Sequence, residues 1–183
     1  MSSIADAMRR IITGDDATGK SCVILDAGPS CQIGSAEMAG LFEVWEDAAT
    51  GPLRAKDHDD LGPKRPVLGA RPGDFQVRWF VINPVPEGIP HADMAKAARE
   101  TFAQFEGEHH ITDQSRHPGM HRTQSIDVVC LIQGEASLVL DGDETRLKPG
   151  NIVIQRGTSH GWVAHGGPAF FMGVVIARDL DRA

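Results

Sequence analysis

Short apolar runs separated by turn residues dominate the chain from Met120 onward. Each run ends at glycine, proline or a polar turn such as Gln133-Gly134 or Pro149-Gly150, which is typical of strands joined by tight connections. The pattern predicts six short strands, at residues 128–132, 136–140, 145–147, 152–155, 161–164 and 170–177. Their close succession predicts an antiparallel meander or barrel.

The first half of the chain has a less regular pattern. It predicts a short helix at residues 4–12 and strands at residues 21–25, 41–45 and 75–82. Residues 48–74 are rich in proline, glycine and charge without periodicity, which predicts a long surface loop. Residues 92–105 repeat apolar side chains at spacings that place them on one face of a helix, and these are Met94, Ala98, Phe102 and Phe105. This helix is expected to be an insertion between two strands.

Composition narrows the fold class. The chain has 183 residues, which suits one domain, and its 20 glycines and 11 prolines disfavour a helical bundle. We therefore expect an all-β or mainly β fold. The three cysteines, Cys22, Cys31 and Cys130, are an odd number at unrelated spacings, so neither a disulfide framework nor a zinc motif is predicted. Cys130 lies within an apolar run and is interpreted as a small core residue.

The charge pattern excludes some classes of partner. The formal net charge of -7 is spread along the chain, and no basic stripe is present, so nucleic acid is not expected to bind. No stretch approaches the ~20 consecutive apolar residues of a membrane helix. The expectation is a soluble, cytoplasmic protein without a membrane partner.

Three polar side chains in the second half are difficult to explain by packing alone. His121 follows the turn Pro118-Gly119, and Asp127 directly precedes the apolar run at residues 128–132. His160 lies in the turn after the run at residues 152–155. Their positions beside strands make them the candidate site residues.

Two motifs resemble those of the cupin superfamily. The His-Arg-Thr run at residues 121–123, followed by Asp127 and by Gly134, resembles the first cupin motif, which has two histidines, a glutamate and a glycine at these spacings. Residues 149–151 and 155–160 resemble the second motif, which has a Gly-Asp pair before a strand and a histidine after it. Both spacings match without gaps.

The chain also departs from the usual cupin pattern. Thr123 stands where the second histidine of the first motif is usual, and Asp127 stands where glutamate is usual. Gln155 replaces a proline, and Ala164 replaces a trailing asparagine. The segments at residues 117–123 and 155–158 resemble a subgroup of small cupins that carry His-Pro-Gly-Met-His-Arg-Thr and Gln-Arg-Gly-Thr.

The resemblance implies a double-stranded β-helix, or cupin jelly-roll barrel, with one inserted α-helix. Within a single domain, residues 119–183 are expected to form the barrel core. Residues 1–118 are expected to complete the barrel with N-terminal strands, the long loop and the inserted helix.

The resemblance also implies a metal site. The ligands carried over are His121, Asp127 and His160, since Thr123 cannot replace an imidazole. Two neutral imidazoles and one carboxylate suit Fe, Mn, Ni or Zn and leave coordination positions open. No organic cofactor is implied. The structural alternative is that Asp127 is paired with Arg122 or with a protonated His160, without a metal.

The function implied is that of a small-molecule enzyme, in which a bound divalent metal ion promotes oxygenation, elimination or isomerisation. In a metal-free variant of that enzyme, His160 or His121 acts as the general base and Asp127 orients its ring. The alternative is a non-catalytic carrier or sensor of a small molecule. A sugar-nucleotide epimerase mechanism is excluded, because the chain has no tyrosine to supply the acid. The side chains expected to line the pocket are Arg122, Thr123, Gln155 and Trp162.

Two further expectations concern surfaces. The strand at residues 21–25 has an edge that needs cover, so a homodimer is expected to form there. The histidines of the inserted loop, His109, His110 and His117, are expected to be solvated.

Overall fold

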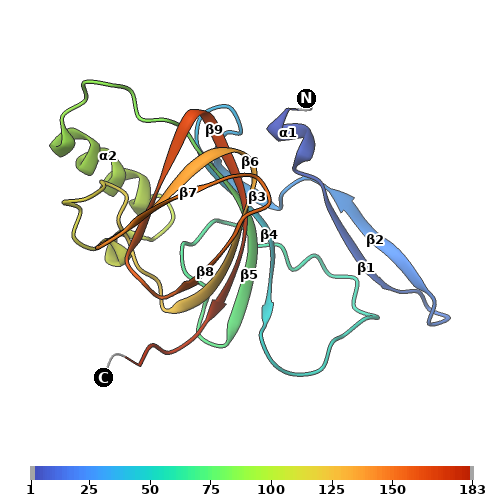
Figure 1. Cartoon of the computed structure of the whole chain (residues 1–183). Coiled ribbons are helices and arrows are strands. Elements are labelled where there is room, and N and C mark those ends of the chain that lie inside the picture. The colour runs from blue at the N-terminus through green and yellow to red at the C-terminus, as the bar shows by residue number, and fades with distance from the viewer. Residues whose placement is uncertain (1–2, 182–183) are drawn as a thin grey trace.

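The computed structural model describes residues 3–181, and its largest feature is a seven-stranded antiparallel sheet that curls into a barrel (Figure 1). The order of the main path is β3-β4-β5-β9-β6-β7, and β8 pairs with β6. The strands of this sheet are β3 (Cys31–Gly34), β4 (Gly40–Ala48), β5 (Asp74–Ile82), β6 (Ser125–Leu140), β7 (Glu144–Leu147), β8 (Ile152–Arg156) and β9 (His160–Ala177). The expected mainly β fold with one inserted helix is confirmed.

Two long strands replace four of the predicted short ones. β6 and β9 pair along almost their whole length, from Ser125 opposite Ala177 to Leu140 opposite His160. The pairing register shifts on both sides of Gln133, so the chain bends there without leaving the sheet. The predicted breaks at residues 133–134 and 166–168 were therefore wrong, because a bulge bends a strand and need not end it.

The bend depends on Gly134. Its φ is +86°, and a Cβ at this position would lie 2.4 Å from the carbonyl oxygen of Pro168. Gly166 has a φ of +69° but no atom within 4 Å of such a Cβ.

We expect Gly134→Ala to lower the free energy of unfolding by about 3 kcal/mol, and Gly166→Ala by about 1 kcal/mol. Both substitutions strain the backbone at a positive φ, but only Gly134→Ala also adds a steric clash. Urea unfolding measures both, and equal losses would contradict the assignment.

The barrel has an apolar interior and a second core on its outside. Phe80, Leu131 and Phe171 lie side by side on neighbouring strands and face inward, and the rings of Phe80 and Phe171 stack at 4.5 Å. On the opposite face of the sheet, Phe42 and Phe170 pack with the short helix α1 (Ile4–Ala7) and its neighbours. One end of the outer face is thereby covered.

The N-terminal strands form a separate hairpin. β1 (Arg10–Asp15) and β2 (Ser21–Ala27) pair only with each other and project away from the barrel (Figure 1). The predicted helix at residues 4–12 ends at Ala7, because the chain enters β1 at Arg10. Arg10 is buried and forms a 2.6 Å ion pair with Asp60, so the long loop is fastened to the hairpin.

The inserted helix α2 (His91–Ala103) lies beside the barrel, on the side away from the hairpin (Figure 1). A short 3-10 helix, η1 (Glu108–His110), follows it and leads back to the barrel. Phe102 and Phe105 anchor this segment, and their rings lie 5.2 Å apart. No helix within residues 3–181 is long and apolar enough to span a membrane.

Candidate functional site

Two of the predicted site residues, His121 and His160, form a close pair. The segment that precedes β6 meets the first residue of β9 through two backbone hydrogen bonds, each 2.9 Å, between His121 and His160. The two imidazole rings have centroids 4.3 Å apart. Two segments almost forty residues apart in sequence thus place their imidazoles side by side, and we call these two residues the histidine pair.

Hydrogen bonds define the tautomer of both rings. Nδ1 of His121 lies 2.8 Å from the carbonyl oxygen of Gly119, and Nδ1 of His160 lies 3.0 Å from that of Thr158. Because a carbonyl oxygen only accepts, each Nδ1 carries the hydrogen and donates it. In the neutral ring Nε2 then keeps its lone pair. This is the arrangement that metal-binding and proton-accepting histidines use.

Burial keeps the histidine pair uncharged. Burial lowers the pKa of His160 to about 4. Burial also lowers the pKa of His121 well below its usual value, and the neighbouring His160 would repel a second charge. Both rings are therefore neutral at about pH 7, since a free histidine has a pKa of about 6.5.

The burial of His160 predicts the pH range in which its imidazole becomes protonated. The pKa of His160 is lowered in the folded protein, so the stability that its neutral ring provides is present above about pH 6.5 and is lost as the pH falls toward about 4. In an NMR titration of the imidazole nitrogens, we expect the His160 signals to stay at their neutral positions until the pH approaches about 4. A midpoint near the free-histidine value would contradict the enclosed site.

Aromatic rings enclose the histidine pair. Phe102 of α2 meets the ring of His121 edge-on at 5.1 Å, and Trp162 of β9 meets His160 at 5.7 Å. His160 is buried, whereas His121 is partly buried. The inserted helix thus contacts His121, while Trp162, which contacts His160, packs against the barrel core.

The inserted loop contributes histidines that were expected to be solvated. His110 is partly buried, and its Nδ1 lies 2.9 Å from the carbonyl oxygen of Arg122. His117 is partly buried, and its Nδ1 accepts the backbone N–H of Gly119 at 3.1 Å. Both lie near enough to His121 to help lower its pKa. The sequence could have predicted that His117 lies near His121, because a Pro-Gly turn links the two residues and folds His117 back toward His121.

Asp127 lies inside the barrel in a different setting. It is in β6, opposite Gln155 of β8 and Val175 of β9, and is 7% exposed. Burial raises its pKa to about 6, and the Ser125 and Thr123 hydroxyls and the Arg78 guanidinium oppose the rise. Its Oδ1 is buried without a hydrogen-bond partner among the described residues. A buried carboxylate oxygen of this kind is costly unless a ligand or ion satisfies it.

The expected convergence of three ligands is not what the structure shows. Among residues 3–181, no three histidine, cysteine, aspartate or glutamate side chains are placed to hold one ion. The histidine pair supplies two donors, and among the described residues no third side chain of these types, Asp127 included, is placed with them to hold one ion. The structural alternative is also corrected, because the cation that acts on Asp127 is Arg78, and His160 is neutral.

A buried ion pair in the barrel wall was not predicted from the sequence. Glu43 of β4 and Arg78 of β5 are cross-strand partners, and a 3.1 Å contact joins Oε1 of Glu43 to a terminal nitrogen of Arg78. Arg78 also donates to the carbonyl oxygens of Leu68 at 2.9 Å and Val67 at 2.7 Å. Burial raises the pKa of Glu43 to about 7. The sequence feature that could have predicted this ion pair is the single charged residue in each of two apolar runs, Glu43 in residues 41–45 and Arg78 in residues 75–82.

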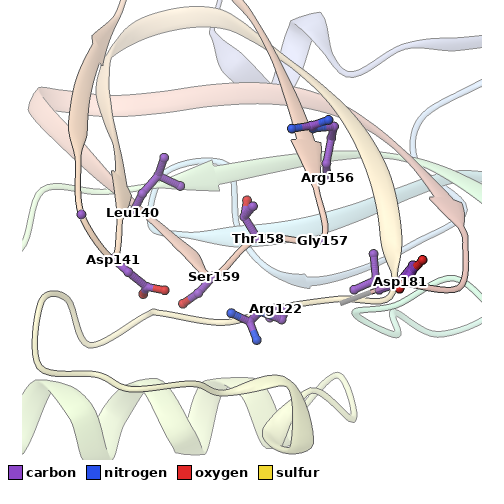
Figure 2. A pocket seen from close by; sticks show the side chains of 10 residues that line it. Arg122, Leu140, Asp141, Arg156, Gly157, Thr158, Ser159 and Asp181 are labelled. Carbon is purple, nitrogen blue, oxygen red and sulfur yellow. The ribbon is translucent and has the colours of Figure 1, made fainter. Parts of the chain in front are cut away.

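A pocket of about 420 Å³ is lined by Arg122 and Ser159, the residues next to His121 and His160 in the sequence, and Figure 2 shows its lining. It lies between the β6–β7 turn, the β8–β9 turn and the C-terminal segment, next to the residues that follow His121 and precede His160. Its lining includes Arg122, Leu140, Asp141, Arg156, Thr158, Ser159 and Asp181. Arg122 is the one predicted pocket residue on this lining, and its buried Nε has no hydrogen-bond partner among the described residues.

The other predicted pocket residues lie in the barrel. Thr123 is buried and accepts a 2.7 Å hydrogen bond from Ser125. Gln155 is buried and donates to the hydroxyl of Thr158. Gln155, which lies opposite Asp127, therefore connects the barrel interior with the turn that carries His160.

Comparison of the chain with curated proteins finds four relatives, and no known family model matches the chain. The "Phomopsin biosynthesis cluster protein D" of Diaporthe leptostromiformis is 32% identical over 157 residues, which are 84% of this chain and 68% of that protein. The "Oryzines biosynthesis cluster protein J" of Aspergillus oryzae is 40% identical over 68 residues, 34% of this chain and 38% of that protein.

The names of two further matches contain the word cupin. The "Cupin-domain-containing oxidoreductase fogC" of Aspergillus ruber is 42% identical over 45 residues, 24% of this chain and 22% of that protein. A solved structure of a cupin superfamily protein from Desulfitobacterium hafniense is 12% identical, with a TM-score of 0.34, and the overlap covers 56% of this chain and 67% of that one.

Proposed function

The chain belongs to the cupin superfamily and to the same family as the phomopsin biosynthesis cluster protein D, and from this premise we propose that it is a biosynthetic enzyme that transforms a small organic molecule. The observation that carries the proposal is the histidine pair, a buried His160 and a partly buried His121 whose imidazoles are neutral and keep a lone pair on Nε2. The names of two relatives refer to biosynthesis clusters, and a third is named an oxidoreductase, which supports this class of function.

The histidine pair suits the transfer of a proton. Nε2 of His160 or His121 accepts a proton from an acidic C–H or O–H group of the substrate, and the resulting imidazolium returns it. Return to another carbon of the substrate completes an isomerisation, and return to a departing group completes an elimination. Burial keeps both rings neutral at about pH 7, so the Nε2 lone pairs are available, and the lowered pKa values also make each imidazole a weaker base than a free histidine, which suits a substrate with an acidic proton.

A divalent metal ion is the cofactor that the cupin motifs imply. His121 and His160 would hold it through Nε2, and their donor chemistry fits, since each Nδ1 donates to a carbonyl oxygen. A bound ion would supply Lewis-acid activation or the oxygen chemistry that oxygenation requires. Asp127 has an unsatisfied buried oxygen but does not form a three-ligand group with the histidine pair, so two of the three predicted ligands fit.

Metal content tests this part of the proposal. We expect protein purified without chelators to retain one Fe, Mn, Ni or Zn ion, and His121→Ala and His160→Ala each to lose most of it, roughly 10–100-fold in affinity. Asp127→Asn is expected to keep the ion, because Asp127 does not form a three-ligand group with the two imidazoles in the described structure. Elemental analysis measures all four proteins. Loss of the ion from Asp127→Asn as well as from the two histidine variants would restore the predicted three-ligand set.

A carrier or sensor is the second candidate function. The pocket lined by Arg122 and Ser159 favours it, because a pocket with an unpartnered buried Arg122 Nε could hold a small molecule without reaction. A stable complex with an unchanged molecule would be its signature.

One experiment separates the two functions. Purified protein is incubated with a small-molecule extract of its source cells, and mass spectrometry follows which compounds are consumed and formed. We expect a substrate and product pair with the unaltered protein and none with His160→Ala. A compound that co-purifies with the protein and is never converted would overturn the enzymatic proposal in favour of binding.

A further inference from the structure

The inward face of the barrel wall changes from apolar to polar along its strands. Pairing registers align its side chains in rows, because residues directly opposite in antiparallel strands point to the same side. The first row belongs to the apolar core, and the next two, toward the start of β6, carry polar and charged side chains. The rows are Phe80, Phe171 and Leu131, then Glu43, Arg78, Gly173 and Val129, then Gln76, Val175, Asp127 and Gln155. Alternate residues of these strands point outward, so Cys130 is partly exposed and is not the core residue expected.

Three charged residues of these rows have buried atoms without hydrogen-bond partners, and we call Glu43, Arg78 and Asp127 the interior polar cluster. The unpartnered atoms are both carboxylate oxygens of Glu43, Nε of Arg78 and Oδ1 of Asp127, four of the five such atoms in residues 3–181. All three residues are more than nine-tenths buried. Arg78 connects the two carboxyls, because it lies 3.1 Å from Glu43 and its charge opposes the rise that burial causes in the pKa of Asp127. Buried atoms of this kind need a partner, which a bound molecule or ordered water supplies.

Gly173 leaves space beside the interior polar cluster. It lies between Arg78 and Val129 in the second row. A Cβ at this position would meet only Cε1 of Phe80 at 3.8 Å and Cγ2 of Val129 at 3.9 Å, and the backbone is not in the left-handed region that requires glycine. A glycine of this kind within a strand is typical of a place that a ligand approaches closely. The space has charged side chains on one side and an aromatic ring on the other.

The polar rows continue to one end of the barrel. Gln76 donates a 3.0 Å hydrogen bond to Glu46, whose side chain is 17% exposed. The exposed Arg71 lies 3.6 Å from Glu46 at this end. A small molecule therefore enters between the charged side chains of this rim and reaches the interior polar cluster from there.

We propose that the barrel interior binds a small organic amine, whose ammonium group is held by Glu43 and Asp127 and whose apolar part packs against Phe80. An ammonium group has three N–H donors and no acceptor, which matches the three unpartnered carboxylate oxygens. Two carboxylates outnumber the one guanidinium, so the cluster attracts a cation more than an anion. A hydroxyl or carbonyl oxygen beside the amine would accept the Nε–H of Arg78.

The donor chemistry favours an organic group at the interior polar cluster. Among residues 3–181 no three histidine, cysteine, aspartate or glutamate side chains are placed to hold one ion, whereas N–H donors need only directed acceptors. The proposal names the chemical class of the bound molecule. It does not depend on whether that molecule is converted at the histidine pair.

Calorimetry with phenylalaninol, an amino alcohol with an aromatic ring, tests the proposal at about pH 8, where the amine is still protonated. We expect it to bind at least about tenfold more tightly than phenylpropanol, which differs only by lacking the amino group. Glu43→Gln and Asp127→Asn are each expected to weaken its binding at least about tenfold, because each removes a charged acceptor. Gly173→Val fills the space and is expected to weaken it to a similar degree.

Two matched controls are expected to bind phenylalaninol as the unaltered protein does. Glu135→Gln removes an exposed carboxylate from β6, the strand of Asp127. Gly167→Val adds the same side chain to β9 as Gly173→Val, at a position with no atom within 4 Å of a Cβ. Circular dichroism establishes that every variant is folded.

The proposal is overturned if phenylalaninol does not bind at millimolar concentration, or binds no better than phenylpropanol, because ordered water alone then satisfies the cluster. It is equally overturned if Glu43→Gln and Asp127→Asn bind as tightly as the unaltered protein, or if Glu135→Gln weakens binding as much as they do. Turnover of a substrate by a protein that fails these binding tests would keep the enzymatic function and remove the amine site alone.

Discussion

Replacing Arg78 with methionine is expected to lower the free energy of unfolding by about 3–5 kcal/mol, the typical cost of removing one partner from a buried ion pair. Glu43 is 0% exposed and Arg78 is 3% exposed, so water does not replace the lost guanidinium. The variant also loses the hydrogen bonds to the carbonyl oxygens of Leu68 and Val67. Equilibrium unfolding in urea measures the loss.

The matched variants separate charge from hydrogen bonding. Glu43→Gln is expected to cost about 1 kcal/mol or less, because the carboxyl, with a pKa raised to about 7, already spends much of its time neutral at that pH. The double variant is expected to recover about half of the loss caused by Arg78→Met, since no charge is left unpaired. Full additivity of the two single losses would show that Glu43 and Arg78 do not interact.

The pH dependence of the Arg78→Met loss has a definite sign. Because the pKa of Glu43 is raised in the folded protein, its stabilising contribution is present at low pH and is lost as the pH rises through about 7. Without Arg78 that pKa rises further. The destabilisation is therefore expected to be smaller at about pH 5 than at about pH 8. A loss that is the same at both values would assign it to the hydrogen bonds alone.

Replacing His160 with alanine is expected to reduce turnover of the substrate by about 10²–10⁴-fold, the usual contribution of a general base. The ring is buried beside His121, and alanine leaves no group there to accept the proton. His165→Ala is the matched control, because it removes an imidazole from the same strand whose Nε2 lies 2.9 Å from the Ser137 hydroxyl. We expect that control to retain its rate.

The rate profile against pH provides a second measurement. A general base must be neutral, so the rate is expected to fall on the acid side with a midpoint near the His160 pKa of about 4, provided the fold persists. A normal rate in His160→Ala, or an acid midpoint near the free-histidine value in the unaltered protein, would remove His160 from the reaction.

Local pattern in the sequence determined the strands, the inserted helix and the likeness to cupins. Apolar alternation is a property of neighbouring residues, so the strands at residues 75–82 and 152–155 were predicted to within one residue at each end. The periodic helix at residues 92–105 was also predicted closely. Motif spacing brought out His121 and His160 as candidates, because a fixed number of residues along a strand and its turn fixes where a side chain can point.

Tertiary structure alone decided which candidates meet. His121 and His160 are brought together by hydrogen bonds between segments far apart in the chain, whereas Asp127 lies within β6, opposite Gln155 of β8 and Val175 of β9. The ion pair of Arg78 with Glu43 depends on the register of β4 against β5. Register and strand order are long-range properties that no local pattern encodes, and they also leave Ile152 and Ile154 of β8 exposed, because burial depends on what packs against a side chain and not on its own hydrophobicity.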